Sequence, residues 1–460
     1  MMPISSRADR FKQGKALRLE TPRETHADLN GNLSRNAVAI LAESDKDRVP
    51  ELIPERYSRM SVDPFAFLRG AAAVMAADLA GQPTAGISVQ AGGDSHLMNF
   101  GAFVTPENYI LFDVNDFDET LPGVDFTVDV KRLAASVAVA ALDSGASKKT
   151  ARAYAAATVG AYRSHMAALA KMSPLEIWHS RIDLEKEIDR IAHGGLRRKL
   201  ASVVAKARSE GLSKDDNFPH LVGENDMRIV DKPPTIFHLD PKADVQHRLS
   251  FQRVFAVYQE GVTQDRLQLL DRFAMKDLVF KAVGVGSVGT FCCVGLFLSG
   301  DNEPLFLQLK QAQHSVLERL GSKLRYKGHQ GLRVVEGQRM MQAASDIFLG
   351  HTQDGATGRQ FYLRTLKNRR LGGISEISEE EALSSYAQLC GRTLSRAHAR
   401  SGDPAAMAGY MGKSEVFDDA IASFAMLYAS QTIRDHAALV AARTAAKSAK
   451  AVPTRTAKAA

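Results

Sequence analysis

The sequence predicts an α+β chain folded as two lobes, and three observations carry that prediction. The 460 residues are too many to close around a single hydrophobic core. Helical periodicity dominates both ends of the chain, whereas β-branched and aromatic strand patterns gather in the segment between them. A hydrophobic content of 45% with 24% charged residues is typical of a soluble globular protein, which excludes a mostly disordered or collagen-like chain.

Changes in composition divide the chain into five segments. Residues 1–60 are polar and helical, and we expect them to form an N-terminal extension without a core of its own. Residues 61–215 begin a large helical lobe, residues 216–375 form a small β-rich lobe, and residues 376–436 return to the large lobe. Residues 437–460 are rich in Ala, Lys and Thr, so we expect a basic disordered tail.

Each element is predicted in chain order from its local pattern. Residues 63–79 are Ala-rich and begin with Asp-Pro, which favours a helix start. A strand at 87–90 precedes a loop, and residues 109–112 and 114–117 resemble a hairpin. Helices are then expected at 128–142, 150–169, 175–207 and 249–273, strands within 278–311, a helix at 331–345, strands at 348–352 and 361–366, and helices from 379 to 441.

The net charge of +7 is concentrated at the two ends of the chain. Residues 437–460 contain five cations and no acid, and residues 1–20 contain five cations and two acids. The body between them is therefore close to neutral, and no aromatic interleaving or helix-turn-helix pattern accompanies the basic ends. We expect no specific nucleic-acid partner.

The number of cysteines and the lengths of the apolar runs indicate the cellular compartment of the protein. Cys292, Cys293 and Cys390 are too few for a disulfide framework and have no metal-ligand spacing, so we expect buried thiols. The N-terminus lacks an apolar signal-peptide core, and the longest apolar runs are well below the roughly 20 residues of a membrane helix. A cytoplasmic protein without a membrane partner is expected.

The first motif with chemical meaning is a glycine-rich loop. Gly284, Gly286 and Gly289 form G-x-G-x-x-G within VGVGSVGT, with Ser287 inside the loop. A dinucleotide-binding version must open a helix, but the residues that follow are β-branched, aromatic and apolar. A glycine turn between two strands is typical of the nucleotide loop of protein kinases. The loop is predicted to cover a bound nucleotide.

A lysine follows at the end of the third strand of the same predicted sheet. In a kinase-like lobe, a lysine in this position contacts the α- and β-phosphates and pairs with a glutamate on the next helix. Lys310 takes this role in the prediction, and Glu336 is its expected partner, with Glu318 as the alternative.

The segment GGDSHLMNFG combines a carboxylate and an amide at a meaningful spacing. Asp94 and Asn99 are five residues apart, as in the H-R-D-x-x-x-x-N loop of kinases. The carboxylate of Asp94 is predicted to accept a proton from the acceptor hydroxyl, and His96 is expected to orient the loop. Asn99 is predicted to bind a divalent cation through its amide oxygen.

An acidic cluster in FDVNDFDE completes the predicted metal site. Asp116 is the expected second ligand of Mg²⁺, with Asp118 and Asp113 as alternates. Neighbouring carboxylates repel one another unless a cation lies among them, which favours a metal over a simple turn. Turn chemistry remains the alternative interpretation.

The order of these motifs is rotated relative to an ordinary kinase, because the predicted catalytic loop precedes the glycine loop. The sequence therefore predicts a circularly permuted kinase-like fold, since a site assembles in space whatever the chain order.

The stretches DPFAFLRG, GGDSHLMNFGAF, FDVNDFDETLPG, KAVGVGSVGT and LRVVEGQRMMQAASDIFLG resemble the bacterial family called domain of unknown function 2252. The loop around Asp94 also resembles that of aminoglycoside phosphotransferases, in which a histidine follows the catalytic aspartate by two residues. That resemblance implies Asp94 as base, Asn99 and Asp116 as metal ligands and Lys310 as phosphate clamp.

Together these features predict a phosphotransferase that uses ATP and Mg²⁺ on a small-molecule acceptor. Two departures keep alternatives open: Gly92 stands where a histidine is usual, and Asp118 stands where a glycine is usual. The alternatives are a nucleotide-binding pseudokinase with a regulatory role and a nucleotidyl (AMP) transferase. The acceptor and the oligomeric state are not predicted.

Overall fold

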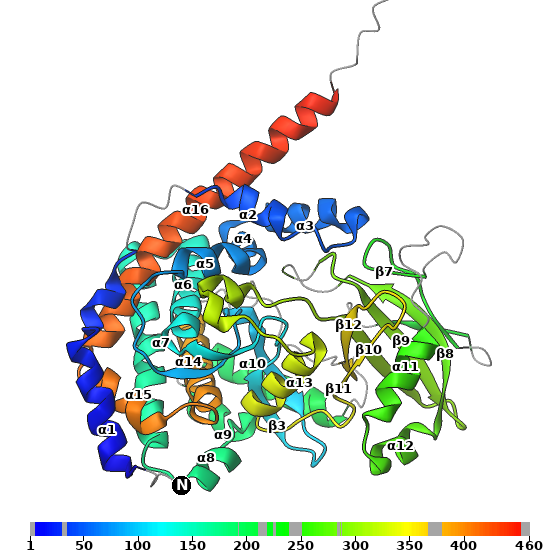
Figure 1. Cartoon of the computed structure of the whole chain (residues 1–460), viewed down its shortest axis with the longest axis horizontal. Helices are drawn as coiled ribbons and strands as arrows, with labels where there is room; N and C mark the ends of the chain where they lie inside the picture. The colour runs from blue at the N-terminus through cyan, green and yellow to red at the C-terminus, as the bar shows by residue number, and fades with distance from the viewer. Residues whose placement is uncertain are drawn as a thin grey trace, which may run out of the picture.

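The computed structural model describes residues 5–29, 35–191, 193–209, 219–223, 227–238, 251–282, 286, 288–366 and 380–451. It is a mixed α+β structure in which helices form one side and a sheet forms the other (Figure 1). This confirms the predicted α+β class and the helices at the N-terminal end.

Four long helices form the centre of the helical part: α6 (Thr127–Asp143), α7 (Lys148–Leu169), α14 (Glu380–Ala399) and α16 (Val416–Ala451). Helix α6 is buried along almost its whole length, because its Ala- and Val-rich sequence packs against α7 and α16. The other helices are α1 (Arg7–Ala16), α2 (Ala37–Glu43), α3 (Ile53–Met60), α4 (Pro64–Gly70), α5 (Ala72–Leu79), α8 (Pro174–His179), α9 (Leu184–Ile188), α10 (Gly194–Ser209), α11 (Phe251–Glu260), α12 (Gln264–Leu270), α13 (Gln330–Met341) and α15 (Pro404–Met411).

The larger sheet has six strands, all antiparallel, in the order β11-β12-β10-β9-β8-β7. Its strands are β7 (Ile236–Phe237), β8 (Phe273–Lys281), β9 (Cys292–Ser299), β10 (Pro304–Gln311), β11 (Gly350–Gln353) and β12 (Gln360–Thr365). Helix α13 lies between β10 and β11 in the chain and beside the sheet in space (Figure 1). Strands β8 and β9 thus flank the predicted glycine loop, of which residue 286 and residues 288–291 belong to the described part of the chain.

Two short ladders in the helical part shape the site. Strand β1 (Ser88–Ala91) pairs with β4 (Leu121–Asp125), and β2 (Phe100–Val104) pairs with β3 (Ile110–Val114). The predicted hairpin of 109–112 with 114–117 is wrong, because β3 pairs backwards with β2 and residues 115–117 form a loop. A third ladder joins β5 (Leu221–Val222) and β6 (Arg228–Ile229).

The predicted disordered tail from residue 437 is wrong as far as Ala451, because α16 continues to that residue. Leu439 is buried against α2 and α4 residues, and the Arg443 guanidinium donates to the Tyr57 carbonyl oxygen at 2.6 Å. Alanine is the strongest helix former, which explains the length of this helix. Its C-terminal end projects beyond the rest of the molecule (Figure 1). Residues 452–460 lie outside the described residues.

The main apolar cluster crosses from the helical part to the sheet part. It includes Val89 and Leu121 from the helical part together with Val334, Met341 and Tyr362 from α13 and β12. The three cysteines are buried free thiols, as predicted. No described helix has both the length and the apolarity that crossing a bilayer requires.

Candidate active site

The loop that follows β1 is held by a buried carboxylate at the start of α6. The backbone N–H groups of Gly92 and Gly93 donate to the two oxygens of Asp129, at 2.6 and 3.0 Å. His398 Nε2 lies 3.1 Å from the same carboxylate, and its Nδ1 lies 2.9 Å from the Tyr162 hydroxyl. Gly93 has φ +83°, which a residue with a side chain adopts only with strain. This network fixes the position of the next residue, Asp94.

The Asp94 carboxylate is paired with an arginine from α6. Arg132 donates to Asp94 Oδ1 through Nε at 2.9 Å and through Nη2 at 2.5 Å. Burial raises the pKa of Asp94, Arg132 opposes the rise, and the nearby Asp116 adds to it. The repulsion from Asp116 shows that these two carboxylates are electrostatic neighbours. A carboxylate whose pKa is raised is a stronger base than an ordinary aspartate, which suits it to accept a proton.

His96 and Asn99 shape the loop around Asp94. The Asn99 side-chain amide donates to the Asp94 carbonyl oxygen at 2.7 Å, and the His96 carbonyl oxygen accepts from the Asn99 backbone N–H at 2.9 Å. His96 is buried, its Nδ1 accepts from the Met98 N–H, and its Nε2 lies 3.6 Å from Asp94 Oδ2. His96 is therefore beside Asp94 and positions the loop.

The β2–β3 ladder brings the second acidic segment to this loop. The Asn115 N–H donates to the Asn99 carbonyl oxygen at 2.9 Å, so Asp116 follows one residue after a direct contact with the Asp94 loop. The side-chain oxygen of Asn115 is buried and has no hydrogen-bond donor in the described part of the chain. An acceptor oxygen left unpaired beside carboxylates suits a cation.

Asp118 takes the partner role that was predicted for Glu336. Its carboxylate forms an ion pair with Lys310 Nζ and accepts a hydrogen bond of 2.8 Å from the Tyr362 hydroxyl. Burial works to lower the pKa of Lys310, but Asp118, Tyr362 and Asp116 more than offset it, and the pKa is raised. Lys310 is 2% exposed, so its charge depends on these acidic partners.

The predicted pair of Lys310 with Glu336 is absent, because Glu336 is on the exposed face of α13. The buried cation of that helix is Arg333, which donates to the carbonyl oxygens of Asp118 and Thr120. The alternative, Glu318, pairs with His314 instead.

The described residues of the glycine loop contact the other parts of the site. A Cβ placed on Gly286 would lie 3.8 Å from Asp94 Oδ2 and 3.0 Å from the Arg69 carbonyl oxygen. The Gly289 carbonyl oxygen accepts from the Val49 N–H at 2.7 Å, and Arg48 donates to the Val288 carbonyl oxygen. Gly284 and Ser287 lie outside the described residues.

Several residues that shape the site were not predicted from the sequence: Asn115, Asp129, Arg132, Arg333 and Tyr362. One signal could have identified two of them. Asp129 and Arg132 interrupt the apolar run of α6, and charged residues in a buried helix are rare unless they are paired.

Two of the residues predicted as possible metal ligands are engaged by other side chains. Asp113, one alternate ligand, forms a buried ion pair with Arg396 at 2.5 Å and is part of the scaffold. Asp118 is occupied by Lys310 and Tyr362. In the described ranges, no three His, Cys, Asp or Glu side chains gather closely enough to hold a metal ion by themselves.

The fold and the site define a mixed α+β protein in which partly buried carboxylates from a helical part meet a buried lysine and residues of a glycine loop from an antiparallel sheet. Residues 48–442 match the model of a family described as "Uncharacterized protein conserved in bacteria (DUF2252)", and the chain belongs to that family. No curated protein and no solved structure matches the chain.

Proposed function

We propose that this protein is a Mg-ATP-dependent phosphotransferase with a circularly permuted kinase-like architecture, acting on a small-molecule acceptor. The observation that carries the proposal is the approach of Gly286 to the Asp94 carboxylate, because these residues are far apart in sequence and match two separate parts of a kinase site. The position of Lys310 on the third strand, counted from the strand before the glycine loop, supports the same assignment.

Each side chain has a proposed task. Asp94 accepts the proton of the acceptor hydroxyl, and Arg132 holds its carboxylate in place. Lys310, oriented by Asp118 in place of a glutamate on α13, binds the nucleotide phosphates. The oxygens of Asn99, Asn115 and Asp116 are suited to Mg²⁺, and the unpaired Asn115 oxygen fits such a role. A bound Mg²⁺ would neutralise charge on the transferred phosphoryl group.

Nucleotide binding and phosphoryl transfer are tested separately. Mg-ATP should raise the melting temperature of the wild type and of Asp94→Asn, but not of Lys310→Met or Asp116→Asn. With γ-labelled ATP and a bacterial metabolite extract, Asp94→Asn should reduce label transfer by about 10² to 10⁴-fold. Glu336→Gln is the matched control, since this carboxylate is exposed and should leave both results unchanged.

Two results would contradict the proposal: a wild type that Mg-ATP does not stabilise, or an Asp94→Asn variant that transfers label at the wild-type rate. Transfer of an α-label instead would identify a nucleotidyl transferase.

A pseudokinase is the second candidate, and one observation favours it. Arg132 donates twice to the Asp94 carboxylate while Gly286 lies close to it, so the proposed base is already engaged by an arginine. Stabilisation by Mg-ATP without label transfer to any acceptor would select this candidate.

A further inference from the structure

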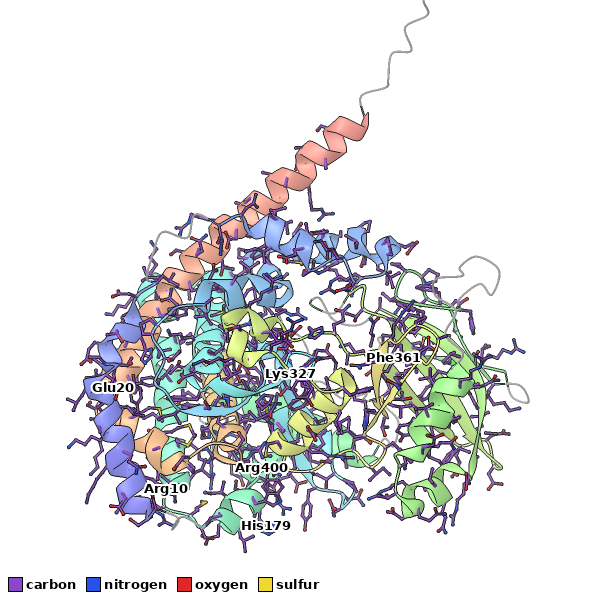
Figure 2. All side chains as sticks on the ribbon, in the orientation of Figure 1. Arg10, Glu20, His179, Lys327, Phe361 and Arg400 are labelled. Carbon is purple, nitrogen blue, oxygen red and sulfur yellow. The ribbon has the colours of Figure 1, made fainter. Side chains whose placement is uncertain are left out.

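A cavity of about 650 Å³ opens away from the candidate active site. Its walls come from the β2–β3 turn, the end of α8, the α11–α12 connection and the segment 339–349. None of the site residues around Asp94 or Lys310 lines it. Figure 2 labels His179, which lines the cavity, and Arg400, which stacks on Trp178, both in the lower part of the view.

Two arginine–aromatic stacks lie at this cavity: Tyr109, Trp178 and Arg181 line it, and Arg400, which does not line it, packs on Trp178. The Arg181 guanidinium lies 3.8 Å from the centre of the Tyr109 ring, and Arg400 lies 3.8 Å from the centre of the Trp178 ring. Arg400 also donates to the Trp178 carbonyl oxygen at 3.0 Å, which fixes the indole. Tyr109 and Trp178 are still 44% and 45% exposed. The stacks hold two flat apolar surfaces open to the cavity.

The cavity has an excess of positive charge. Of the arginines that line it, Arg181 and Arg339 have no carboxylate partner within the described ranges, and Arg339 donates to the Leu349 carbonyl oxygen. Burial and the nearby Arg396 lower the pKa of Arg400, which stacks on Trp178, to about 10, while Asp113 opposes this shift.

The acids of this cavity do little to offset these cations. Asp346 is engaged by the backbone N–H groups of Phe348 and Thr365 and by the Thr365 hydroxyl. Arg266 alone has an acidic neighbour, Asp265 at 3.2 Å on the surface. Glu107 is the other lining acid, and it is exposed.

We propose that this cavity is a second ligand site, which binds a small phosphorylated metabolite that carries a planar ring. The arginine forks suit the phosphate, since guanidinium groups recognise phosphate oxygens in pairs. Tyr109 and Trp178 suit the ring, and the volume lies within the range of small-molecule sites.

The proposed ligand would contact both parts of the molecule. Thr105–Leu111 and Trp178–Arg181 belong to the helical part, whereas Tyr258–Arg266 and Asp346–Leu349 border the sheet. The segment between α13 and β11 is tied to β3, because the Ala343 N–H donates to Asp113 Oδ2 at 2.9 Å. The site stands independently of the proposed function.

Trp178 is the single tryptophan of the chain, so intrinsic fluorescence reports directly on this cavity. The probe is phenyl phosphate, and benzyl alcohol is the uncharged control. Phenyl phosphate should change the fluorescence saturably, and benzyl alcohol should not. Arg339→Gln and Arg181→Gln should each weaken binding by about tenfold, as expected when one charge-assisted hydrogen bond is lost.

Both arginines are exposed, so the two variants should fold, which thermal melting will verify. Asp116→Asn should bind phenyl phosphate like the wild type. The proposal is overturned by a wild-type Kd weaker than about 10 mM, or by binding in both arginine variants that is as tight as in the wild type. Loss of binding in Asp116→Asn would also overturn it, because it would assign the signal to the nucleotide cleft.

Discussion

Glu119 is a partly buried acid directly after the Asp118 that pairs with Lys310. Its carboxylate accepts a hydrogen bond of 2.7 Å from the Val316 N–H, and its carbonyl oxygen accepts from the Ser315 hydroxyl. Burial raises the pKa of Glu119 to about 7, although the Val316 hydrogen bond opposes the rise. The protonated form is therefore favoured by folding.

We expect Glu119 to make the stability of the protein depend on pH. Because its pKa is higher in the folded chain than the ordinary value of 4.5, its contribution is full below that value and is lost as pH rises to about 7. Glu119→Gln keeps the acceptor oxygen and removes the titration, so its melting temperature should fall less than that of the wild type between pH 5 and 8. The exposed Glu336→Gln serves as control. An equal fall in melting temperature between pH 5 and 8 for the wild type and Glu119→Gln would contradict the proposed role of Glu119.

Residue types and spacings predicted part of the candidate site, but not the direction in which each side chain points. Asp94, Asn99 and Lys310 were identified from the sequence. The β1–β4 and β2–β3 ladders fix the backbone that joins the Asp94 loop to the acidic segment, and Lys310 reaches that segment through its ion pair with Asp118. The predicted pairing of Glu336 with Lys310 was wrong because Glu336 lies on the exposed face of α13, as does Arg339 three residues later. Only the packing of that helix decides which stripe faces inward.

Helix α6 acts as the support of the loop around Asp94. Its first turn supplies Asp129, a fully buried carboxylate that accepts from two backbone N–H groups and from His398. Removing the charge of a buried group with several partners leaves those donors poorly satisfied. The sequence offered only an apolar helix here, and the tertiary partner His398 is far along the chain.

We therefore expect Asp129→Asn to lower the free energy of unfolding by about 3 kcal/mol, in urea denaturation followed by circular dichroism. Asp419→Asn is the matched control, because Asp419 forms an exposed pair with Arg152 and its loss should cost less than about 1 kcal/mol. Similar losses in the two variants would show that Asp129 does not support the loop.

The C-terminal half of α16 offers a second test at the level of the element. Leu439 is 1% exposed and packs with Leu41 and Met60, whereas its neighbour Val440 is 38% exposed. Leu439→Ala should cost about 2 to 5 kcal/mol of unfolding free energy, and Val440→Ala about 0.5 kcal/mol or less, by urea denaturation. Equal and negligible losses of unfolding free energy in the two variants would instead support the disordered tail predicted from composition.

The disordered tail predicted from composition was wrong for the end of α16 because an Ala-rich stretch is both low in complexity and high in helix propensity. The predicted pairing partner of β3 was wrong because local sequence preference did not mark the observed partner, β2. Phe100–Val104 contains Gly101 and Ala102, which are weak strand formers, so its pairing depends on neighbours rather than on intrinsic preference. Strongly patterned strands, such as β12, were predicted close to their observed bounds.

At the level of the whole molecule, the helical part and the sheet part share one apolar cluster. Val335, Met341 and Tyr362 pack into the same cluster as residues of α6 and α14. Polar contacts cross the same junction, since Lys310 pairs with Asp118 and the Gln342 side chain donates to the Val114 carbonyl oxygen. Chain length predicted several independent units, and it could not reveal that their cores merge.

The shared cluster predicts that both parts unfold in a single transition, although chains of this size often unfold in steps. Unfolding of the sheet alone would expose the helical face that Tyr362 and Met341 cover. Trp178 fluorescence reports on the helical part, and in a Cys390→Ser variant the reactivity of Cys292 and Cys293 reports on the sheet. The two signals should share one urea midpoint. Thiols that become reactive at lower urea than the fluorescence change would show that the sheet unfolds by itself, and the junction would then be a contact between separate domains.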